Sequence, residues 1–308
     1  MKSRLLKILL LLLFLLPVIF LALFFFYPLL SIFAVSFFPE GALDLSGFTA
    51  LVTRPYYRDV LGFTIWQAFL STLFTMLFGL PAAYLFARFR FPGKTLLRAI
   101  LTVPFVMPTV VVATAFLALL GPRGYLNQLF VSLFQLETPP IQLQNTLALI
   151  LLAHVFYNLT VVIRLVGGFW ANLDPQVEEA AAILGARPLR VFLEVTLPLL
   201  MPSLGAAALL IYLFTFSSFG VVLILGGLRY ATIEVEIYRQ TVSFFNLPLA
   251  ATLSLIQMAF TFLTMTLYTR LQARTTVPLT LRSQQSVQRP ATSWQQRAFL
   301  LLAVGAPT

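Results

Sequence analysis

Cysteine is absent from this chain of 308 residues, histidine occurs only once, and charged residues make up 10% of the sequence. Without cysteine the protein can form neither disulfide bonds nor thiolate ligands for a metal. The single histidine, His154, has no second histidine or cysteine with which to complete a metal site. Soluble domains carry about 25% charged residues, so the shortage of charge excludes an ordinary soluble protein.

Long apolar runs take the place of charge, and hydrophobic residues make up 60% of the sequence. Six runs reach the ~20 residues that a helix needs to cross a bilayer. Their apolar residues are continuous rather than alternating, which favours helices over a membrane barrel. We therefore expect an all-α membrane protein whose six transmembrane helices cover Lys7–Phe38, Val60–Phe89, Leu96–Leu120, Asn145–Trp170, Leu199–Leu225 and Leu249–Leu271.

Basic residues are unevenly distributed among the connections and predict an orientation. Fourteen of the 20 Lys and Arg residues lie at the N-terminus or around the connections after the second, fourth and sixth runs, and five lie in the other loops. The positive-inside rule then places the N-terminus in the cytoplasm. The same rule explains the net charge of +10. We expect no nucleic-acid partner, because no basic face is interleaved with aromatic side chains.

The segment at residues 171–198, between the fourth and fifth runs, is polar and falls on the cytoplasmic side. Asp174 followed by Pro175 is a strong helix start, because Asp caps the first turn and Pro fits the first helical position. Gly185 suits the left-handed residue that ends a helix, and Pro188 can begin a second one. We expect two short helices joined by a tight turn, which could form either a solvated connector or a docking surface.

The first of these helices has a narrow face of mostly small side chains, since its apolar residues recur at helical spacing. A small-residue face lets another surface approach closely. Beyond the second helix, two prolines are expected to break the chain before the fifth span. The residues of the face are Val177, Ala180, Ala181 and Leu184, and the two prolines are Pro198 and Pro202.

The spacing within this segment resembles the signature of ABC importer permeases, which reads E-A-A, three residues, G, nine residues, then I-x-L-P. Here Glu179-Ala180-Ala181 is followed after three residues by Gly185, and after nine more by Val195-Thr196-Leu197-Pro198. Valine in place of isoleucine is a mild departure from the pattern. The resemblance covers Leu61–Gln272 and implies a six-helix type I permease bundle in a bacterial inner membrane.

In that family the polar loop is a coupling helix that docks in a groove of a cytoplasmic ATPase. The resemblance therefore implies three protein partners: cytoplasmic ABC ATPase subunits, an extracytoplasmic substrate-binding protein, and a second permease half or subunit. Membrane lipid surrounds the spans. The residues that it implies in ATPase coupling are Asp174, Glu178, Glu179, Ala180, Ala181, Gly185, Arg187, Leu197 and Pro198.

Two further stretches are similar to the permeases of thiamine and iron(III) importers: FTFSSFGVVLILGG at Phe214–Gly227 and YATIEVEIYRQ at Tyr230–Gln240. Such permeases are often fused pairs of six-span halves, and the chain resembles their N-terminal half. A thiamine-like or iron(III) substrate is the corresponding expectation.

The expected organisation follows the apolar runs. A first helix with a periplasmic loop occupies 1–59, a permease core 60–272, and a polar cytoplasmic linker 273–297. The apolar run at 298–308 is too short to span a bilayer. We expect it to begin a second membrane half, with a peripheral tail as the alternative.

Nothing in the sequence supplies energy for transport. None of the ten Asp and Glu residues lies in a predicted span, whereas intramembrane proton relays place Asp, Glu or His at depth. Gly93-Lys94-Thr95 resembles the end of a P-loop, but Arg88 stands where that motif needs glycine. We expect no cofactor on this chain, with ATP and Mg²⁺ bound by the partner ATPase.

Polar side chains inside the spans are few and allow two interpretations. They either line the transport pathway or join the helices by hydrogen bonds. The candidates are His154, Tyr157 and Asn158 on one face of the fourth span and Thr215, Ser217 and Ser218 in the fifth.

Two other functions remain open beside the permease subunit, which is not an enzyme. One is a membrane-embedded enzyme, for which Ser217 or Ser218 with His154 is the only conceivable nucleophile–base pair. The other is an assembly subunit that transports nothing.

Overall fold

The computed structural model describes residues 13–38, 41–227 and 229–275, so the predicted apolar run at 298–308 lies outside the described residues. All regular elements in the described part of the chain are helices. Two compact units divide the chain, residues 1–60 with 236–258 and residues 61–235 with 259–308. Six described helices are long and apolar enough to cross a membrane: Leu13–Ala34, Pro55–Arg88, Thr109–Phe134, Leu147–Ala171, Pro188–Phe216 and Leu247–Ala273.

The first unit surrounds a buried carboxylate. Glu236, predicted to lie in a loop, is instead only 1% exposed. It stays satisfied because the Tyr56 hydroxyl donates to it at 2.8 Å and the Gln240 amide at 2.7 Å. The helices here are η1 (Ala22–Phe26), α2 (Tyr27–Phe37), α3 (Ser46–Thr53), η3 (Arg239–Ser243), and parts of α4 (Pro55–Arg88), α13 (Ile233–Tyr238) and α14 (Leu247–Thr275).

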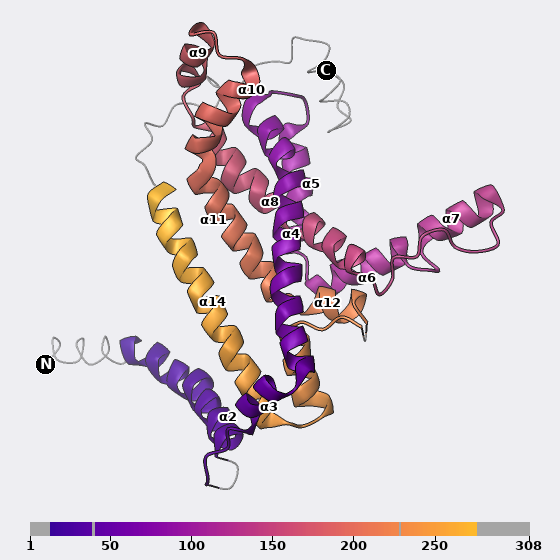
Figure 1. The fold of residues 1–308 in the computed structure, drawn as a ribbon, viewed down its shortest axis with the longest axis vertical. Helices are drawn as coiled ribbons and strands as arrows, with labels where there is room; N and C mark the ends of the chain where they lie inside the picture. The colour runs from indigo at the N-terminus through magenta and orange to yellow at the C-terminus, as the bar shows by residue number, and fades with distance from the viewer. Residues whose placement is uncertain (1–12, 39–40, 228, 276–308) are drawn as a thin grey trace, which may run out of the picture. The chain divides into compact units, whose positions relative to one another are not determined.

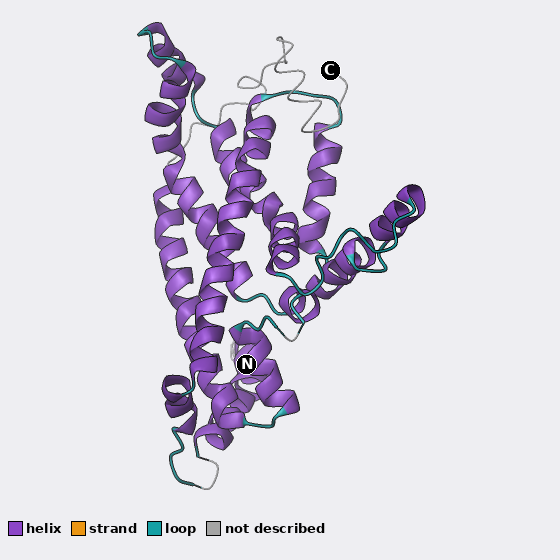
Figure 2. Cartoon of the chain, turned by 45° about the vertical axis from the view of Figure 1, so that its right-hand side comes forward, coloured by secondary structure: helices purple, strands orange, loops and turns teal. Residues whose placement is uncertain are grey.

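In the second unit, α4, α8 (Leu147–Ala171) and α11 (Leu197–Phe216) run beside one another (Figures 1 and 2). Small residues allow this close packing. A Cβ added to Gly79 would lie 2.7–2.9 Å from three side-chain atoms of Val162, and one on Gly167 would lie 3.2 Å from the Ala83 carbonyl oxygen. Gly79, Ala83 and Ala87 follow one another at four-residue intervals, which is the small-xxx-small pattern of close membrane helix pairs.

The third predicted span is broken. Leu96–Leu120 forms two helices, α5 (Lys94–Val106) and α6 (Thr109–Leu120), which point in different directions in Figure 1. The reason is local: Pro108 disfavours the helical conformation for the residue before it, and Met107 is extended with φ −70° and ψ 146°. Beyond α6, a short helix follows, α7 (Tyr125–Phe134).

The fifth span also departs from expectation, in two ways. Its predicted C-terminal part separates at Ser217 and continues as α12 (Gly220–Leu225). At the other end, the break expected at Pro198 and Pro202 is wrong, because helix continues from Pro188 to Phe216. A π turn, η2 (Phe192–Thr196), precedes Pro198 and closes with a bond from the Leu197 N–H to the Phe192 carbonyl. Proline has no backbone N–H to donate, and a π turn lets the helix continue through the point where this bond is missing.

Candidate functional site

The polar loop folds as its sequence predicts. Helix α9 (Pro175–Ile183) begins at Asp174, whose carboxylate accepts a bond from the Gln176 N–H at 3.1 Å. Gly185 ends it with φ +86°. The Gly185 N–H donates to Ala182 O at 2.9 Å and the Ala186 N–H to Ala181 O at 3.2 Å, which together form a Schellman motif. Helix α10 (Pro188–Val191) then leads into η2 and α11.

The tip of this loop is apolar and exposed. Ile183 is 86% exposed and Leu184 88%. No residue of α9 or α10 is buried, so neither helix is held by a hydrophobic core within the described chain. Glu179, Ala180 and Arg187 are exposed as well, whereas Ala181 is half-buried. Leaving large aliphatic side chains in water is unfavourable, which makes the tip a candidate docking surface.

The two adjacent glutamates of α9 have different environments. Glu179 is exposed, whereas Glu178 faces the helices of the unit and pairs with Arg88 at the end of α4. The same Glu178 oxygen, Oε1, accepts a bond of 2.9 Å from the Thr196 hydroxyl in η2. Glu178 was grouped with Glu179 from the sequence, but in the structure it joins α9 to two other segments.

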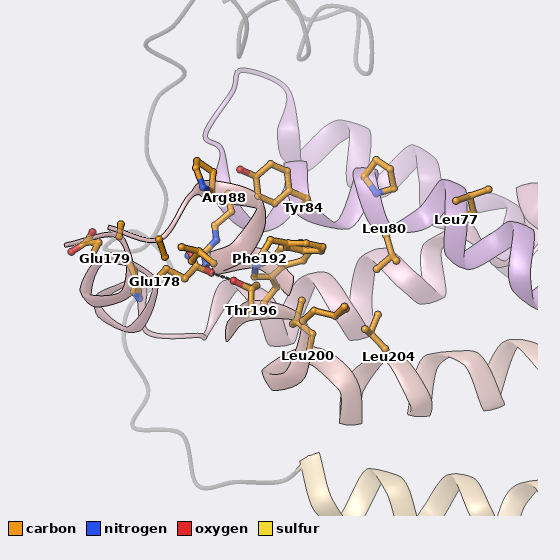
Figure 3. A pocket seen from close by; sticks show the side chains of 18 residues that line it. Leu77, Leu80, Tyr84, Arg88, Glu178, Glu179, Phe192, Thr196, Leu200 and Leu204 are labelled. Atoms are coloured by element: carbon orange, nitrogen blue, oxygen red, sulfur yellow. Dashed lines mark hydrogen bonds and ion pairs between the residues drawn. The ribbon is translucent and has the colours of Figure 1, made fainter. Parts of the chain in front are cut away.

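A cavity of about 1020 Å³ lies behind the loop (Figure 3). Arg88, Glu178, Glu179 and Thr196 stand at one end of it, and the leucines of α4 and α11 stand at the other. An aromatic group lies between them, in which the Trp170 ring contacts Tyr84 and stacks on Phe192. The leucines are Leu77, Leu80, Leu200 and Leu204.

Three of the six predicted polar residues of the fourth and fifth spans, His154, Asn158 and Ser218, meet inside the helix bundle. His154 is 3% exposed, and its Nε2 lies 2.8 Å from the Ser218 hydroxyl. Its Nδ1 lies 2.8 Å from the Ser71 hydroxyl of α4. The Asn158 amide donates to the His154 carbonyl oxygen at 2.9 Å. The two contacts of the imidazole join α8 to α4 and to the segment after α11, whereas the Asn158 bond lies within α8. None of the residues involved lines the cavity of Figure 3.

The remaining three candidates have environments different from that of His154. Thr215 is fully buried and donates to Ile211 O at 2.9 Å in its own helix. The Tyr157 hydroxyl donates to Met107 O at 3.2 Å, where the third span is broken. Ser217 is half-buried at the C-terminal end of α11.

A polar row on α4 was missed from the sequence. Gln67 donates to the Thr215 carbonyl oxygen at 2.7 Å and Ser71 contacts His154, so this row joins α4 to both the fifth and the fourth spans. Its members are Thr64, Gln67, Ser71 and Thr75, each 0% exposed. The signal was available, because the intervals of three, four and four residues place all of them on one helix face.

Arg88 was likewise counted only as an orienting charge. It is a lone cation at the end of the second span and is only 6% exposed, which requires a partner in the fold. The burial is a finding of the structure, and no pattern in the sequence indicated the ion pair with Glu178.

Lys94, in the P-loop-like stretch, has a local structural role. Gly93 precedes α5 with φ +75°, and the Lys94 ammonium donates to Phe89 O at 2.8 Å. Burial, and secondly the charges of Arg98 and Arg90, lower the pKa of the Lys94 amine to about 8. Among the described residues, no group of three or more His, Cys, Asp or Glu side chains could hold a metal ion.

Comparisons with known proteins agree on one family. The model described as "Binding-protein-dependent transport system inner membrane component" matches residues 76–277. The putative 2-aminoethylphosphonate transport system permease protein PhnU of Salmonella typhimurium (strain LT2) is 30% identical over 264 residues, 85% of this chain and 92% of PhnU. The thiamine transport system permease protein ThiP of Escherichia coli (strain K12) is 36% identical over 205 residues, 66% of this chain and 38% of ThiP. The sulfate permease protein CysT of Salmonella typhimurium is 34% identical over 177 residues, 58% of this chain and 62% of CysT.

Solved structures support the same fold. A bacterial ABC transporter that imports the acidic polysaccharide alginate aligns with a TM-score of 0.66 at 15% identity, covering 89% of this chain and 97% of that one. The MetNI methionine ABC transporter in inward-facing conformations aligns with a TM-score of 0.52 at 17% identity, covering 73% of this chain and all of that one. These likenesses concern the fold alone, and they confirm the predicted all-α bundle.

Proposed function

Since the chain belongs to the family of binding-protein-dependent transport system inner membrane components, it is a permease subunit of an ABC importer, and we propose that the loop at 171–198 couples it to a separate ATPase. The enzyme considered from the sequence is set aside by the family, although His154 and Ser218 lie within hydrogen-bond distance.

The observation that carries the coupling role is the exposed tip of α9. Its Schellman turn presents Ile183 and Leu184 to solvent while Glu179 stands beside them. An apolar centre with a charged rim is the composition of a protein-docking surface. The docking partner is a cytoplasmic ATPase that carries ATP and Mg²⁺, so the loop that contains α9 lies in the cytoplasm. The distribution of basic residues favours the same side of the membrane for the N-terminus.

A permease half of six spans cannot enclose a pathway alone, so we include a second permease half or subunit in the assembly. A binding protein delivers solute on the opposite side of the membrane. Transport then proceeds by alternating access, in which closure of the ATPase subunits shifts the helical bundles as rigid bodies.

For the substrate we propose a small nitrogen-containing organic ion, thiamine or 2-aminoethylphosphonate. The names of two relatives support this class, PhnU over most of the chain and ThiP at higher identity. The name of CysT makes sulfate the competing possibility. Iron(III), expected beside thiamine from the sequence, is in none of these three names.

The test of coupling compares charge reversals at two exposed glutamates, Glu179→Lys at the tip and Glu194→Lys in η2. Both variants should insert into the membrane in wild-type amounts. Glu179→Lys should lose at least tenfold in affinity for the ATPase, and Glu194→Lys should bind as the wild type does. Equal binding by all three proteins would count against docking at α9.

Uptake of labelled thiamine, 2-aminoethylphosphonate and sulfate into proteoliposomes with the complete importer distinguishes the substrates, since the correct one alone is taken up with ATP.

A further inference from the structure

We propose that Arg88, Glu178 and Thr196 form a latch that makes the docking loop move together with the second and fifth spans. The proposal rests on the proposed coupling function and deepens it. It gives Glu178 a positioning role inside the permease, separate from the docking role of its neighbour Glu179. The three residues are referred to below as the latch.

The latch joins three segments at one atom. Oε1 of Glu178, in α9, accepts bonds from the Arg88 guanidinium at the end of α4 and from the Thr196 hydroxyl in η2. Arg88 and Thr196 lie 90 and 18 residues from Glu178 in the sequence. Because η2 continues directly into α11, a displacement of α9 is applied to both spans through the same carboxylate.

Burial makes this ion pair different from a surface pair. The Arg88 side chain is 8% exposed and that of Glu178 29%, so water competes weakly for the bonds. A second ion pair of the loop, Arg190–Glu194, is 69% and 61% exposed and is of the kind that contributes little. Separating Glu178 from Arg88 would leave a buried guanidinium without its counter-charge, which is strongly destabilising.

The surroundings leave the latch as the main side-chain connection of α9. Helix α9 buries no residue, and behind it lies the cavity of about 1020 Å³ instead of a packed core. Thr196 is the one buried residue of η2. Apart from its backbone connections to α8 and α10, a helix without apolar anchoring transmits a force mainly through its polar side-chain contacts. Figure 3 shows those contacts between Glu178, Arg88 and Thr196.

The test uses distances between spin labels, because the chain contains no cysteine and labels can be placed at will. Cysteines replace Arg90, after α4, and Gln176, in the first turn of α9 and away from the docking tip; both residues are exposed. Pulsed EPR on the full chain in lipid nanodiscs then measures the distance between the loop and α4. We expect one narrow distance in the otherwise unchanged protein.

Variants of the latch should broaden the distribution of distances between the two labels, and by amounts that differ among the three residues. Glu178→Gln and Arg88→Gln should broaden it at least twofold, Thr196→Val should broaden it less, and the exchange Arg88→Glu with Glu178→Arg should narrow it again. Glu194→Gln, which breaks only the exposed pair, should leave it unchanged. The proposal is overturned if Glu178→Gln and Arg88→Gln keep the narrow distance, or if Glu194→Gln broadens it equally.

The same samples with the ATPase bound separate this proposal from the coupling function. With an intact latch, the label distance should stay narrow when ATP is added, since α9 and α4 move together. In Glu178→Gln the ATPase should still bind, because the tip is intact, but ATP should shift α9 without α4. If the wild-type chain binds no ATPase, the coupling function fails, while the measurements without ATPase still decide whether the latch exists.

Discussion

Replacing Gly185 with alanine should weaken docking of the ATPase subunit while the membrane-embedded helices stay folded. Gly185 has φ +86°, and a left-handed backbone costs a residue with a Cβ about 1–2 kcal/mol. An added Cβ would meet no atom within 4 Å, so no steric clash adds to this cost. In the undocked variant the loop can relieve this strain by leaving the turn, whereas docking requires the turn that presents Ile183 and Leu184. The strain therefore lowers the affinity for the ATPase.

A cost of this size corresponds to a loss in affinity of about 5- to 30-fold, since about 1.4 kcal/mol is a factor of ten. The assay is the dissociation constant of the ATPase for the full chain in nanodiscs, measured by biolayer interferometry. Gly185→Asn should lose less, because asparagine tolerates the left-handed region better than alanine.

Gly168→Ala is the matched control for this prediction. Gly168 lies in α8, its φ is not positive, and an added Cβ would likewise meet nothing within 4 Å. Alanine is favoured over glycine inside a helix, so this variant should bind the ATPase as tightly as the wild type. If Gly185→Ala binds within twofold of Gly168→Ala, the turn does not govern docking and the reasoning is refuted.

Two further predictions concern packing and protonation. Gly79→Val should lower stability by about 1–3 kcal/mol through overpacking, because its Cβ would lie 2.7–2.9 Å from the Val162 side chain. Thermal unfolding in detergent should show partial recovery in the double variant with Val162→Ala, which removes the two γ-carbons but keeps the Cβ at 2.7 Å. The absence of any recovery would contradict helix contact as the cause. Lys94 has a pKa lowered to about 8, so its neutral, reactive amine should predominate above that pH and acylation, followed by peptide mass spectrometry, should reach half its maximum rate near pH 8. A midpoint near 10.4, the value of a free lysine, would show that burial and the two arginines do not act on it.

Features that depend on neighbours in the chain were predictable from the sequence. Asp174, Pro175 and Gly185 fix the ends of α9 through capping and the left-handed turn, which need only a few residues. The six apolar runs likewise predicted the helical class, because each has to bury or satisfy its backbone within itself. Both successes come from local rules.

Features that depend on distant partners were not predictable. Ser71 lies 83 residues from His154, and Arg88 lies 90 residues from Glu178, so no local pattern links either pair. The prolines show a different limit. Pro108 breaks its span, whereas Pro198 and Pro202 do not break theirs. Pro198 follows the π turn at Phe192–Thr196 and stands in the first turn of α11, while Pro202 lies inside that helix.

That π turn also sets the rotation of the fifth span around its own axis relative to the loop. Successive residues of an α-helix are rotated by about 100°, and a wide turn inserts a residue without ending the helix. The side chains before η2 therefore occupy different angular positions around the helix axis, relative to those in α11, than they would in an uninterrupted α-helix. Thr196 is the last residue of the wide turn and faces Glu178, so the phase offset decides which face of the fifth span points away from the loop. Adding or deleting one residue here would rotate that span relative to α9, although the sequence of the span itself would stay the same.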